Sequence, residues 1–253
     1  MSLKVSLITA TYNSAKTLDM CMSSVLNQTY SNIEYIIIDG KSNDGTLELI
    51  ASKSETHHQI KWISEKDKGI YDALNKGLSR VTGDVVGFVH SDDYLAEMTT
   101  IEKIVNAFDK HKVDGVYGNL HYVNFDDVNQ IVRNWVSQPF RNKLLNRGWM
   151  PAHPTLFLKN DVYNDNGDFD LNYDIAADYD FILRIFGKRK YTFHYLSETI
   201  IKMRVGGASN RSLKNVLTKT KEDYRAAKTN GLRFPFKVIL QKNLSKIPQW
   251  FKK

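Results

Sequence analysis

Short apolar segments rich in β-branched residues alternate with stretches of helical spacing through the first 115 residues of the chain. Four segments have the pattern of buried strands: Val5–Ala10, Glu34–Ile38, Lys61–Ser64 and Val85–Val89. Helical patterns follow the first three of them: Ala15–Asn27, Leu47–Lys53 and Tyr71–Val81. Strands and helices that alternate at this interval build βαβ units. The pattern therefore predicts an α/β fold with a Rossmann-like, mainly parallel central sheet flanked by helices.

The second half is less regular. Its predicted helices are Ile101–His111 and Asp178–Gly187, and its predicted strands are Gly115–Val123, Gln130–Val136 and Thr155–Leu158. The segment Pro139–Trp149 fits either a helix or a loop.

Length and composition favour one large domain with at most a small appendage, because 253 residues with 42% hydrophobic content can bury a substantial core. No apolar run approaches the roughly 20 residues that span a bilayer. The N-terminal strand pattern is not followed by a small-residue cleavage site. Cys21 is alone and has no internal disulfide partner. We expect a cytosolic protein, with Cys21 packed in a helix.

Positive charge is concentrated at the C-terminal end. Beyond residue 213 eleven basic residues stand against Glu222 and Asp223, which leaves the rest of the chain close to neutral. Apolar side chains interleave with these lysines and arginines, from Leu232 to Phe251. Two readings stay open for this basic extension. It lies as an amphipathic segment on an anionic membrane, or it packs as a helix against the body with its lysines in solvent.

The segment Phe88–Asp93 joins an apolar run to two adjacent carboxylates. Asp92 and Asp93 therefore come at the carboxyl end of a predicted strand, where open α/β sheets bind ligands. Paired acidic side chains suit hard divalent cations, and such a cation indicates a phosphorylated ligand. The first strand lacks the Gly-x-Gly-x-x-Gly turn that a dinucleotide cofactor needs.

Five segments together resemble family 2 glycosyltransferases with the GT-A fold. They are Ser6–Asn13, Ile38–Thr46, Glu65–Gly77, the Ser-Asp-Asp cluster at residues 91–93, and Ala177–Asp180. The resemblance covers about residues 3–210. It implies a GT-A domain over 1–210, with a nucleotide-binding half to about residue 115 and an acceptor half at 116–210. Residues 211–253 would form a separate basic extension.

The resemblance also implies residues that bind a nucleotide-sugar donor. They are Thr9, Thr11, Asn13, Asp39, Asp67, Asp92 and Arg204, with Asp93 as the ligand of Mn²⁺ or Mg²⁺. Asp39 matches the carboxylate that pairs with a uracil ring, and its alternative role is to cap the loop before Gly40. Thr11 and Asn13 also fit an N-cap of the first helix, and Asp67 also fits a solvated surface charge.

The matching catalytic base is Asp178, at the start of a predicted helix, and its alternative role is a helix cap. Ala177 stands where the family usually has glutamate, and Ser91 stands at the first position of the commoner Asp-x-Asp motif. His153 would lie near the acceptor or the metal, and its alternative role is a satisfied turn residue before Pro154. Arg204 would pair with the leaving diphosphate, and the glycines that follow it would form a loop that closes over the donor.

The implied activity is inverting sugar transfer from a nucleotide diphosphate donor, a UDP-sugar by family habit, to a hydroxyl of a glycan or lipid-linked acceptor. Family members commonly extend lipid-linked carriers at the cytoplasmic membrane, so a peripheral contact with an anionic membrane is a further expectation. The two departures from the family pattern support one alternative, a catalytically degenerate nucleotide-sugar-binding scaffold. Nucleic acid is not expected as a partner, because the body carries no recognition motif.

Overall fold

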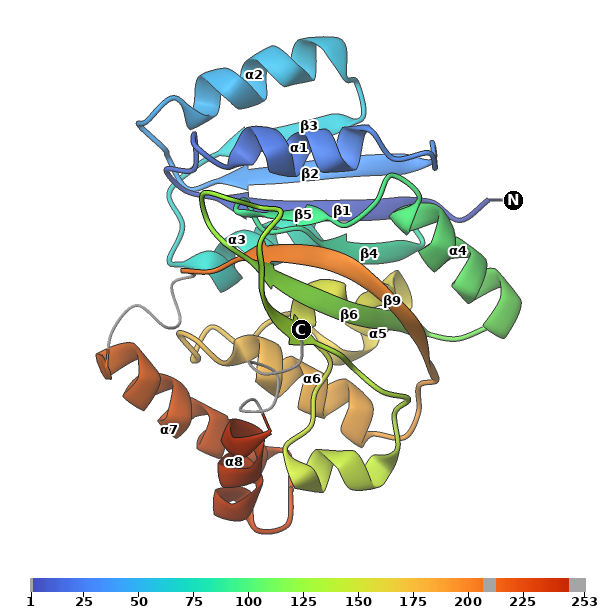
Figure 1. Ribbon diagram of the computed structural model, residues 1–253, viewed down its shortest axis with the longest axis vertical. Coiled ribbons are helices and arrows are strands. Elements are labelled where there is room, and N and C mark those ends of the chain that lie inside the picture. The colour runs from blue at the N-terminus through green and yellow to red at the C-terminus, as the bar shows by residue number, and fades with distance from the viewer. Residues whose placement is uncertain (1, 207–212, 246–253) are drawn as a thin grey trace.

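The computed structural model describes residues 2–206 and 213–245. In these residues one nine-stranded sheet has the order β3-β2-β1-β4-β8-β6-β9-β5, with β7 paired to β6 (Figure 1). The strands β1 (Val5–Thr11), β2 (Ile33–Asp39), β3 (Ile60–Ser64) and β4 (Val85–Phe88) form its parallel half. The predicted Rossmann-like arrangement is confirmed for this half.

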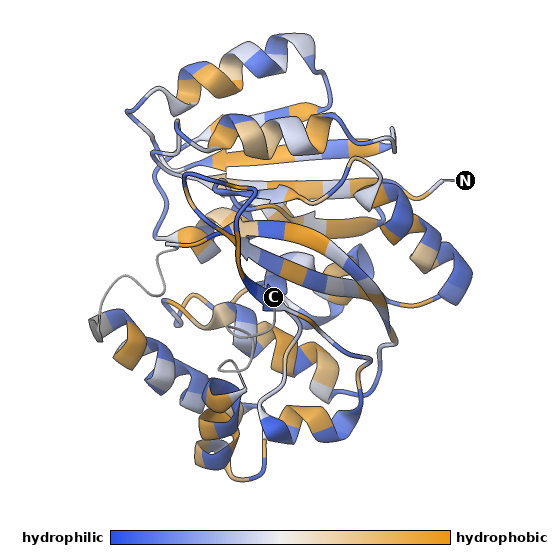
Figure 2. Ribbon diagram, in the orientation of Figure 1, coloured by the Kyte–Doolittle hydropathy of each residue, from blue (hydrophilic) through white to orange (hydrophobic). Residues whose placement is uncertain are grey.

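Helices cover both faces of the sheet. Side chains on both sides of the central strands are therefore buried, and most of them are apolar. Val5 and Leu7 of β1 pack toward α1 (Leu18–Leu26), α2 (Thr46–Thr56) and α4 (Thr100–His111). Ile8 and Ala10 face the other layer, with α3 (Ile70–Leu78), α5 (Asn160–Asn166) and α6 (Ala177–Gly187). Figure 2 shows the resulting hydrophobic bands along the central strands.

The second half of the sheet mixes directions. Short β8 (Phe157–Lys159) pairs antiparallel with both β4 and β6 (Gly115–Val123) and joins the two halves. Beyond it lie β9 (Phe193–Arg204), parallel to β6, and β5 (Asp93–Leu95), antiparallel to β9. β7 (Ile131–Trp135) forms a hairpin with β6. The open segment at 139–149 contains the 3-10 helix η1 (Asn142–Arg147).

Two helices of the basic extension pack against the body. They are α7 (Leu213–Thr229) and α8 (Pro235–Leu244), and they lie below α6 in Figure 1. Ala226, Ala227, Val238 and Ile239 belong to the same hydrophobic cluster as α6. Residues 246–253, which complete the predicted amphipathic segment, lie outside the described residues. Among the described helices none is long and apolar enough to cross a bilayer.

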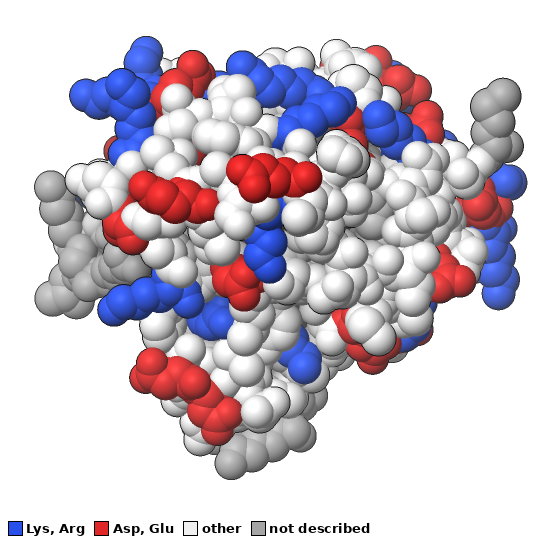
Figure 3. Space-filling view, turned by 90° about the horizontal axis from the view of Figure 1, so that it is seen from above, with Lys and Arg blue, Asp and Glu red and all other residues white. Residues whose placement is uncertain are grey.

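Charged side chains of both signs are interspersed on the face that Figure 3 shows, which is the side of α1 and α2. An ion pair of 2.9 Å joins Lys53 of α2 to Asp19 of α1. Exposed pairs of this kind contribute little to stability, about 0 to 1 kcal/mol each.

Glu34 on β2 is the charged residue on which we expect the fold to depend most. It is buried, and its carboxylate accepts hydrogen bonds from Ser6 Oγ, from the Thr82 amide and hydroxyl, and from Lys61 Nζ. Burial alone would raise the pKa of Glu34, but the hydrogen bonds from Ser6 and Thr82 outweigh it and hold the pKa below its usual value.

We expect Glu34→Gln to destabilise the fold by about 2 to 4 kcal/mol at neutral pH, because buried donors then lose a charged acceptor. A lowered pKa stabilises the fold above the unfolded value of about 4.3, and that stability is lost as the pH falls toward the folded value. Urea unfolding from pH 7 to pH 3 should therefore show a steeper acid loss in the wild type than in the variant. Equal slopes would contradict this prediction.

Candidate active site

The loops after β1 and β2 lie next to each other at the carboxyl edge of the parallel half, where Thr11 is in register with Asp39. The Gly40 amide donates to the Thr11 carbonyl at 2.9 Å. The Asn13 amide donates to Ser42 Oγ, and Asn13 Oδ1 accepts from the Asn43 amide. Asn13 has φ +49°, a left-handed conformation that asparagine tolerates better than most residues. The two loops therefore form one cross-linked wall.

Asp39 stabilises this wall from its buried side. Its side chain is fully buried, and its carboxylate accepts hydrogen bonds from the Ser42 amide, from Ser42 Oγ and from Ser64 Oγ at 2.6 Å. This geometry is the loop cap that the sequence left as an alternative. One carboxylate offers about four acceptor positions, so capping leaves capacity for a further donor.

Tyr12 and Asp67 flank Gly40. A Cβ on Gly40 would lie 2.5 Å from Asp67 Oδ2 and 3.3 Å from Tyr12 Cδ2. Asp67 also accepts a hydrogen bond from the Gly69 amide, and the Tyr12 ring is 64% exposed. An exposed flat ring beside a polar loop suits the stacking of a nucleic base. Tyr12 is not among the site residues predicted from the sequence, although it stands between Thr11 and Asn13.

Thr9 and Thr11 differ in accessibility. Thr9 is fully buried, donates to the Val89 carbonyl at 2.6 Å and shares a hydrogen bond with the Tyr35 hydroxyl. The expectation that Thr9 lines the nucleotide pocket does not fit this position, because both faces of β1 are covered and the Thr9 hydroxyl is bonded to the carbonyl of Val89, directly after β4. The Thr11 hydroxyl is buried and has no hydrogen-bond partner among the described residues.

The acidic pair lies where β4 gives way to β5. Asp93 is fully buried, and neither of its carboxylate oxygens has a hydrogen-bond partner in the described part of the chain. Burial, with the neighbouring charge of Asp92, raises the pKa of Asp93 well above its ordinary value, and Arg204 opposes the rise. Arg204 is itself buried and donates to the Asp92 carbonyl at 2.7 Å. It therefore holds the backbone of the acidic pair.

A buried carboxylate whose oxygens accept no hydrogen bond from the described residues suits a hard divalent cation. Binding of the cation would offset the free-energy cost of ionising the buried carboxyl group. Within residues 2–206 and 213–245 no group of three or more His, Cys, Asp or Glu side chains forms a metal cage. An ion on Asp93 would therefore need further oxygens from a ligand or water. Of the loop that would close over the donor, residues 207–209 lie outside the described residues.

Asp178 lies in the first turn of α6, as the sequence predicts. The Tyr71 hydroxyl shares its single proton between the Ile175 carbonyl at 2.6 Å and Asp178 Oδ1 at 3.2 Å. Burial raises the pKa of Tyr71 well above its ordinary value, and the Asp178 charge adds to the rise. Tyr71 therefore stays protonated and can only orient Asp178 as a donor. The sequence interpretation placed Tyr71 in a matching segment but gave it no role.

Two histidines, His90 and His153, lie close to each other, and His90 stands two residues before the acidic pair. The His153 ring is buried against Phe88 and Phe169, with its centroid 6.2 Å from that of His90. Burial lowers the pKa of His153 to about 4, against the charge of Asp178. Burial also lowers the pKa of His90, while Asp92 and Asp178 both oppose the decrease. The charges of Asp92 and Asp178 therefore both act on the His90 imidazole.

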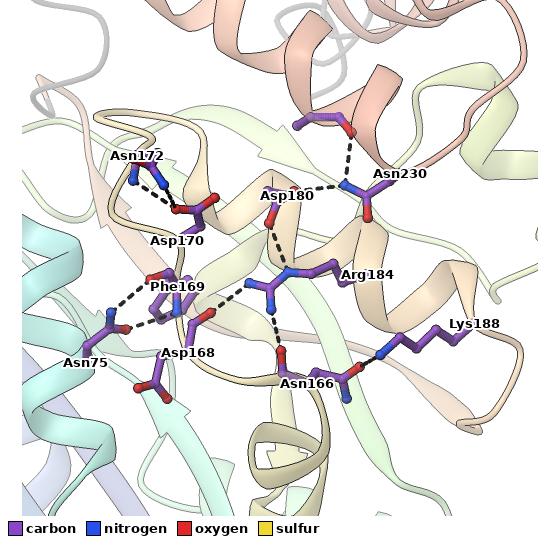
Figure 4. Close-up of polar contacts among 11 residues, drawn as sticks. Asn75, Asn166, Asp168, Phe169, Asp170, Asn172, Asp180, Arg184, Lys188 and Asn230 are labelled. Atoms are coloured by element: carbon purple, nitrogen blue, oxygen red, sulfur yellow. Dashed lines mark hydrogen bonds and ion pairs between the residues drawn. The ribbon is translucent and has the colours of Figure 1, made fainter.

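The segment 166–172 carries Phe169, whose ring packs against His153, and Figure 4 shows the polar contacts that hold this segment. The Asn75 side chain forms two hydrogen bonds with the backbone of Phe169, at 2.9 and 3.0 Å. Arg184 pairs with Asp180 and donates to the carbonyls of Asn166 and Asp168. Phe169 is thereby fixed against His153.

Comparisons with known proteins agree with this architecture. The mannosyltransferase PcManGT from Pyrobaculum calidifontis, solved with GDP-Man and Mn²⁺, superposes with a TM-score of 0.69 over 99% of this chain and 74% of its own, at 16% identity. S. aureus TarS 1-349, solved with UDP-GlcNAc, gives 0.70 over 98% and 78%, at 20% identity. The chain has the GT-A fold of these transferases.

Relatives by sequence carry the comparison further. A PGL/p-HBAD biosynthesis glycosyltransferase of Mycobacterium tuberculosis (strain H37Ra) is 28% identical over 210 residues, which cover 81% of this chain and 78% of that protein. An uncharacterized glycosyltransferase of the same species (strain H37Rv) is 32% identical over 71% of this chain and 68% of its own length. The family model of glycosyl transferase family 2 matches residues 6–166. This chain is a glycosyltransferase and belongs to glycosyl transferase family 2.

Proposed function

We propose that the protein transfers a hexosyl or N-acetylhexosaminyl group, with inversion, from a nucleotide diphosphate donor to a hydroxyl of a glycan or lipid-linked acceptor. One observation carries the proposal: the Asp93 carboxylate is buried without a hydrogen-bond partner among the described residues, three positions after His90, and the charges of Asp92 and of half-buried Asp178 both act on the His90 ring. A UDP-sugar is favoured. The related folds support this donor class, since TarS binds UDP-GlcNAc and PcManGT binds GDP-Man.

In this proposal the wall of the β1 and β2 loops holds the nucleoside. The base stacks on Tyr12, Asp39 and Asp67 accept from its polar edge, and Thr11 and Asn13 line the pocket. Thr9 supports the wall from the core. Asp92 binds the ribose, and Asp93 would hold Mn²⁺ or Mg²⁺. Such an ion would offset the negative charge of the leaving diphosphate.

Asp178 acts as the general base. It accepts the proton of the acceptor hydroxyl while that oxygen forms a bond to the anomeric carbon. The bond from this carbon to the diphosphate oxygen breaks, and its electron pair leaves with the nucleotide. Tyr71 orients the Asp178 carboxylate toward the acceptor. Because the His153 imidazole is neutral, it forms no ion pair with Asp178. Arg204 keeps the acidic pair in place and adds positive charge on the diphosphate side.

Calorimetric titration of UDP, GDP and dTDP, with and without Mn²⁺, tests the donor site. We expect metal-dependent binding of one nucleotide, UDP in the first place. Binding of no nucleotide would refute the site. Release of free sugar from the bound donor separates an enzyme from the alternative scaffold, because a pure binder does not hydrolyse its ligand.

We further propose that α8 contacts an anionic membrane, which would bring a lipid-linked acceptor to the site. Phe236, Leu240 and Leu244 recur every four residues and are 76%, 51% and 52% exposed, while Val238 and Ile239 on the opposite face are buried. Phe234 adds a further exposed ring beside Arg233. An exposed apolar face with basic neighbours suits insertion into the headgroup region.

Sedimentation with phosphatidylglycerol vesicles tests this contact. We expect Phe236→Ser with Leu240→Ser to lower binding by more than about tenfold, since each buried side chain contributes roughly 1.5 to 3 kcal/mol. Met98→Ser is the matched control, because Met98 is 63% exposed near α4. Equal binding of the two variants, or binding to neutral vesicles alone, would contradict the proposal.

A further inference from the structure

Glu222 of α7 is buried and points its carboxylate at a loop far away in the sequence. It accepts hydrogen bonds from three consecutive backbone amides, those of Asp174 at 3.0 Å, Ile175 at 2.8 Å and Ala176 at 3.0 Å. These amides immediately precede α6, which begins at Ala177 and receives no side-chain cap from its own N-cap residue. A carboxylate at this position satisfies amides that the chain leaves unpaired and complements the positive end of the helix.

Arg225 of α7 and Asn230, the first residue after α7, hold the same segment. Arg225 donates to the Asn172 carbonyl at 2.6 Å and stacks on the Tyr173 ring at 4.0 Å. Asn230 donates to Asp180 Oδ1 at 2.8 Å (Figure 4). On the opposite side the Tyr71 hydroxyl bonds the Ile175 carbonyl. Residues 172–180, which include Asp178, are therefore held between α7 and α3.

We propose that Glu222 is a positioning residue for the transfer reaction, and that it acts by holding the backbone that carries Asp178. This inference rests on the proposed role of Asp178 as base. Glu222 has no need to touch donor or acceptor, because its three bonds fix where α6 begins. The catalytic unit then extends into α7, beyond the boundary at residue 210 that the sequence suggests.

Hydrogen exchange of the purified full chain tests the hold without any turnover. In Glu222→Gln the amide nitrogen replaces one acceptor oxygen, so at least one of the three backbone amides loses its partner. We expect peptides covering residues 172–180 to exchange at least about tenfold faster than in the wild type. Glu48→Gln, an exposed glutamate on α2, is the matched control and should leave the exchange unchanged. Unchanged exchange in Glu222→Gln would overturn the proposal.

Steady-state kinetics then test the link to Asp178. We expect Glu222→Gln to lower kcat about 10- to 100-fold with the donor KM unchanged, because a small misplacement of a catalytic group has effects of this size. Glu222→Asp, which keeps the charge, should recover part of the rate. A general loss of structure would instead raise the donor KM and lower the melting temperature of both variants, and that result would overturn the assignment.

Combining Glu222→Gln with Asp178→Asn separates this inference from the proposed function. If Glu222 acts through Asp178, it should not lower the residual rate of Asp178→Asn any further. If Glu222→Gln lowered the transfer rate by the same factor in the wild type and in Asp178→Asn, Glu222 would act independently of Asp178. If Asp178→Asn keeps the wild-type rate, the proposed base is wrong, while faster exchange in Glu222→Gln would still establish the hold on the segment.

Discussion

Asp178→Asn is expected to lower the transfer rate by about 10²- to 10⁴-fold, which is the usual contribution of a general base. Asparagine keeps the size of the side chain and can still accept the hydrogen bond from the Tyr71 hydroxyl. It cannot take a proton from the acceptor. Donor affinity should stay nearly unchanged, because the nucleotide wall is built from the β1 and β2 loops. The measurement is kcat with saturating donor, together with calorimetric titration of the nucleotide.

The matched control is Asp174→Asn, an exposed carboxylate in the segment that precedes α6. It should keep both the rate and the donor affinity, since only the backbone amide of Asp174 is used by Glu222. If Asp178→Asn retained wild-type turnover, the base would have to be another group. A parallel loss of donor affinity in Asp178→Asn would indicate a structural role instead.

The sequence predicted the parallel half of the fold well, because the evidence for it is local. The strands at Val5, Ile33, Ile60 and Val85 combine apolar runs with turn residues at their ends, and each sits within one or two residues of its predicted start. Strand β9 was not predicted, because the local sequence evidence for it is weak. Most of Phe193–Arg204 is only half-buried, so its sequence lacks the continuous apolar run of a central strand.

The supporting contacts of the site were beyond the sequence because they join distant residues. Tyr71 and Asp178 are 107 positions apart, and Glu222 lies 46 to 48 positions from the amides that it holds. Resemblance to a family predicts roles for the carboxylates, because they stand at fixed places in motifs. It could not identify partners that depend on how α7 packs against α6.

The basic extension shows how a charge pattern can support two readings at once. The apolar residues of α8 divide between a buried side, with Val238 and Ile239, and an exposed side, with Phe236 and Leu240. Lys242 on the buried side pairs with Asp223 at 2.8 Å. Burial lowers the pKa of Lys242 to about 8, although Asp223 raises it. Packing therefore uses one side of the helix and leaves the other side exposed.

Asp93→Asn is expected to stabilise the metal-free protein and to abolish metal-dependent nucleotide binding. The wild-type carboxyl group is buried without a hydrogen-bond partner among the described residues, which disfavours its charged form. Asparagine has nearly the same shape and no charge to bury, so we expect a gain of about 1 to 3 kcal/mol at neutral pH. For a chain of this size each kcal/mol raises the melting temperature by roughly 2 to 4 °C.

The raised pKa of Asp93 determines how the stability difference between the wild type and Asp93→Asn changes with pH. Because the folded pKa of Asp93 is raised, the native state keeps a proton that the unfolded chain releases above about pH 3.9. Stability of the wild type in EDTA should therefore fall as the pH rises above that value, whereas the variant lacks this contribution. The difference in melting temperature should widen from pH 4 toward the folded pKa. A variant less stable than the wild type in EDTA would contradict the account.

Adding Mn²⁺ and UDP should reverse the order of the two proteins. Ligands that bind only the native state raise its stability by mass action, so the wild type should gain a melting-temperature shift that the variant lacks. The buried Asp93 carboxylate would then lower the stability of the ligand-free protein and raise that of the protein with Mn²⁺ and UDP bound. If the variant gained the same shift as the wild type, the metal would have to bind without Asp93, and Asp92 would be the next carboxylate to replace.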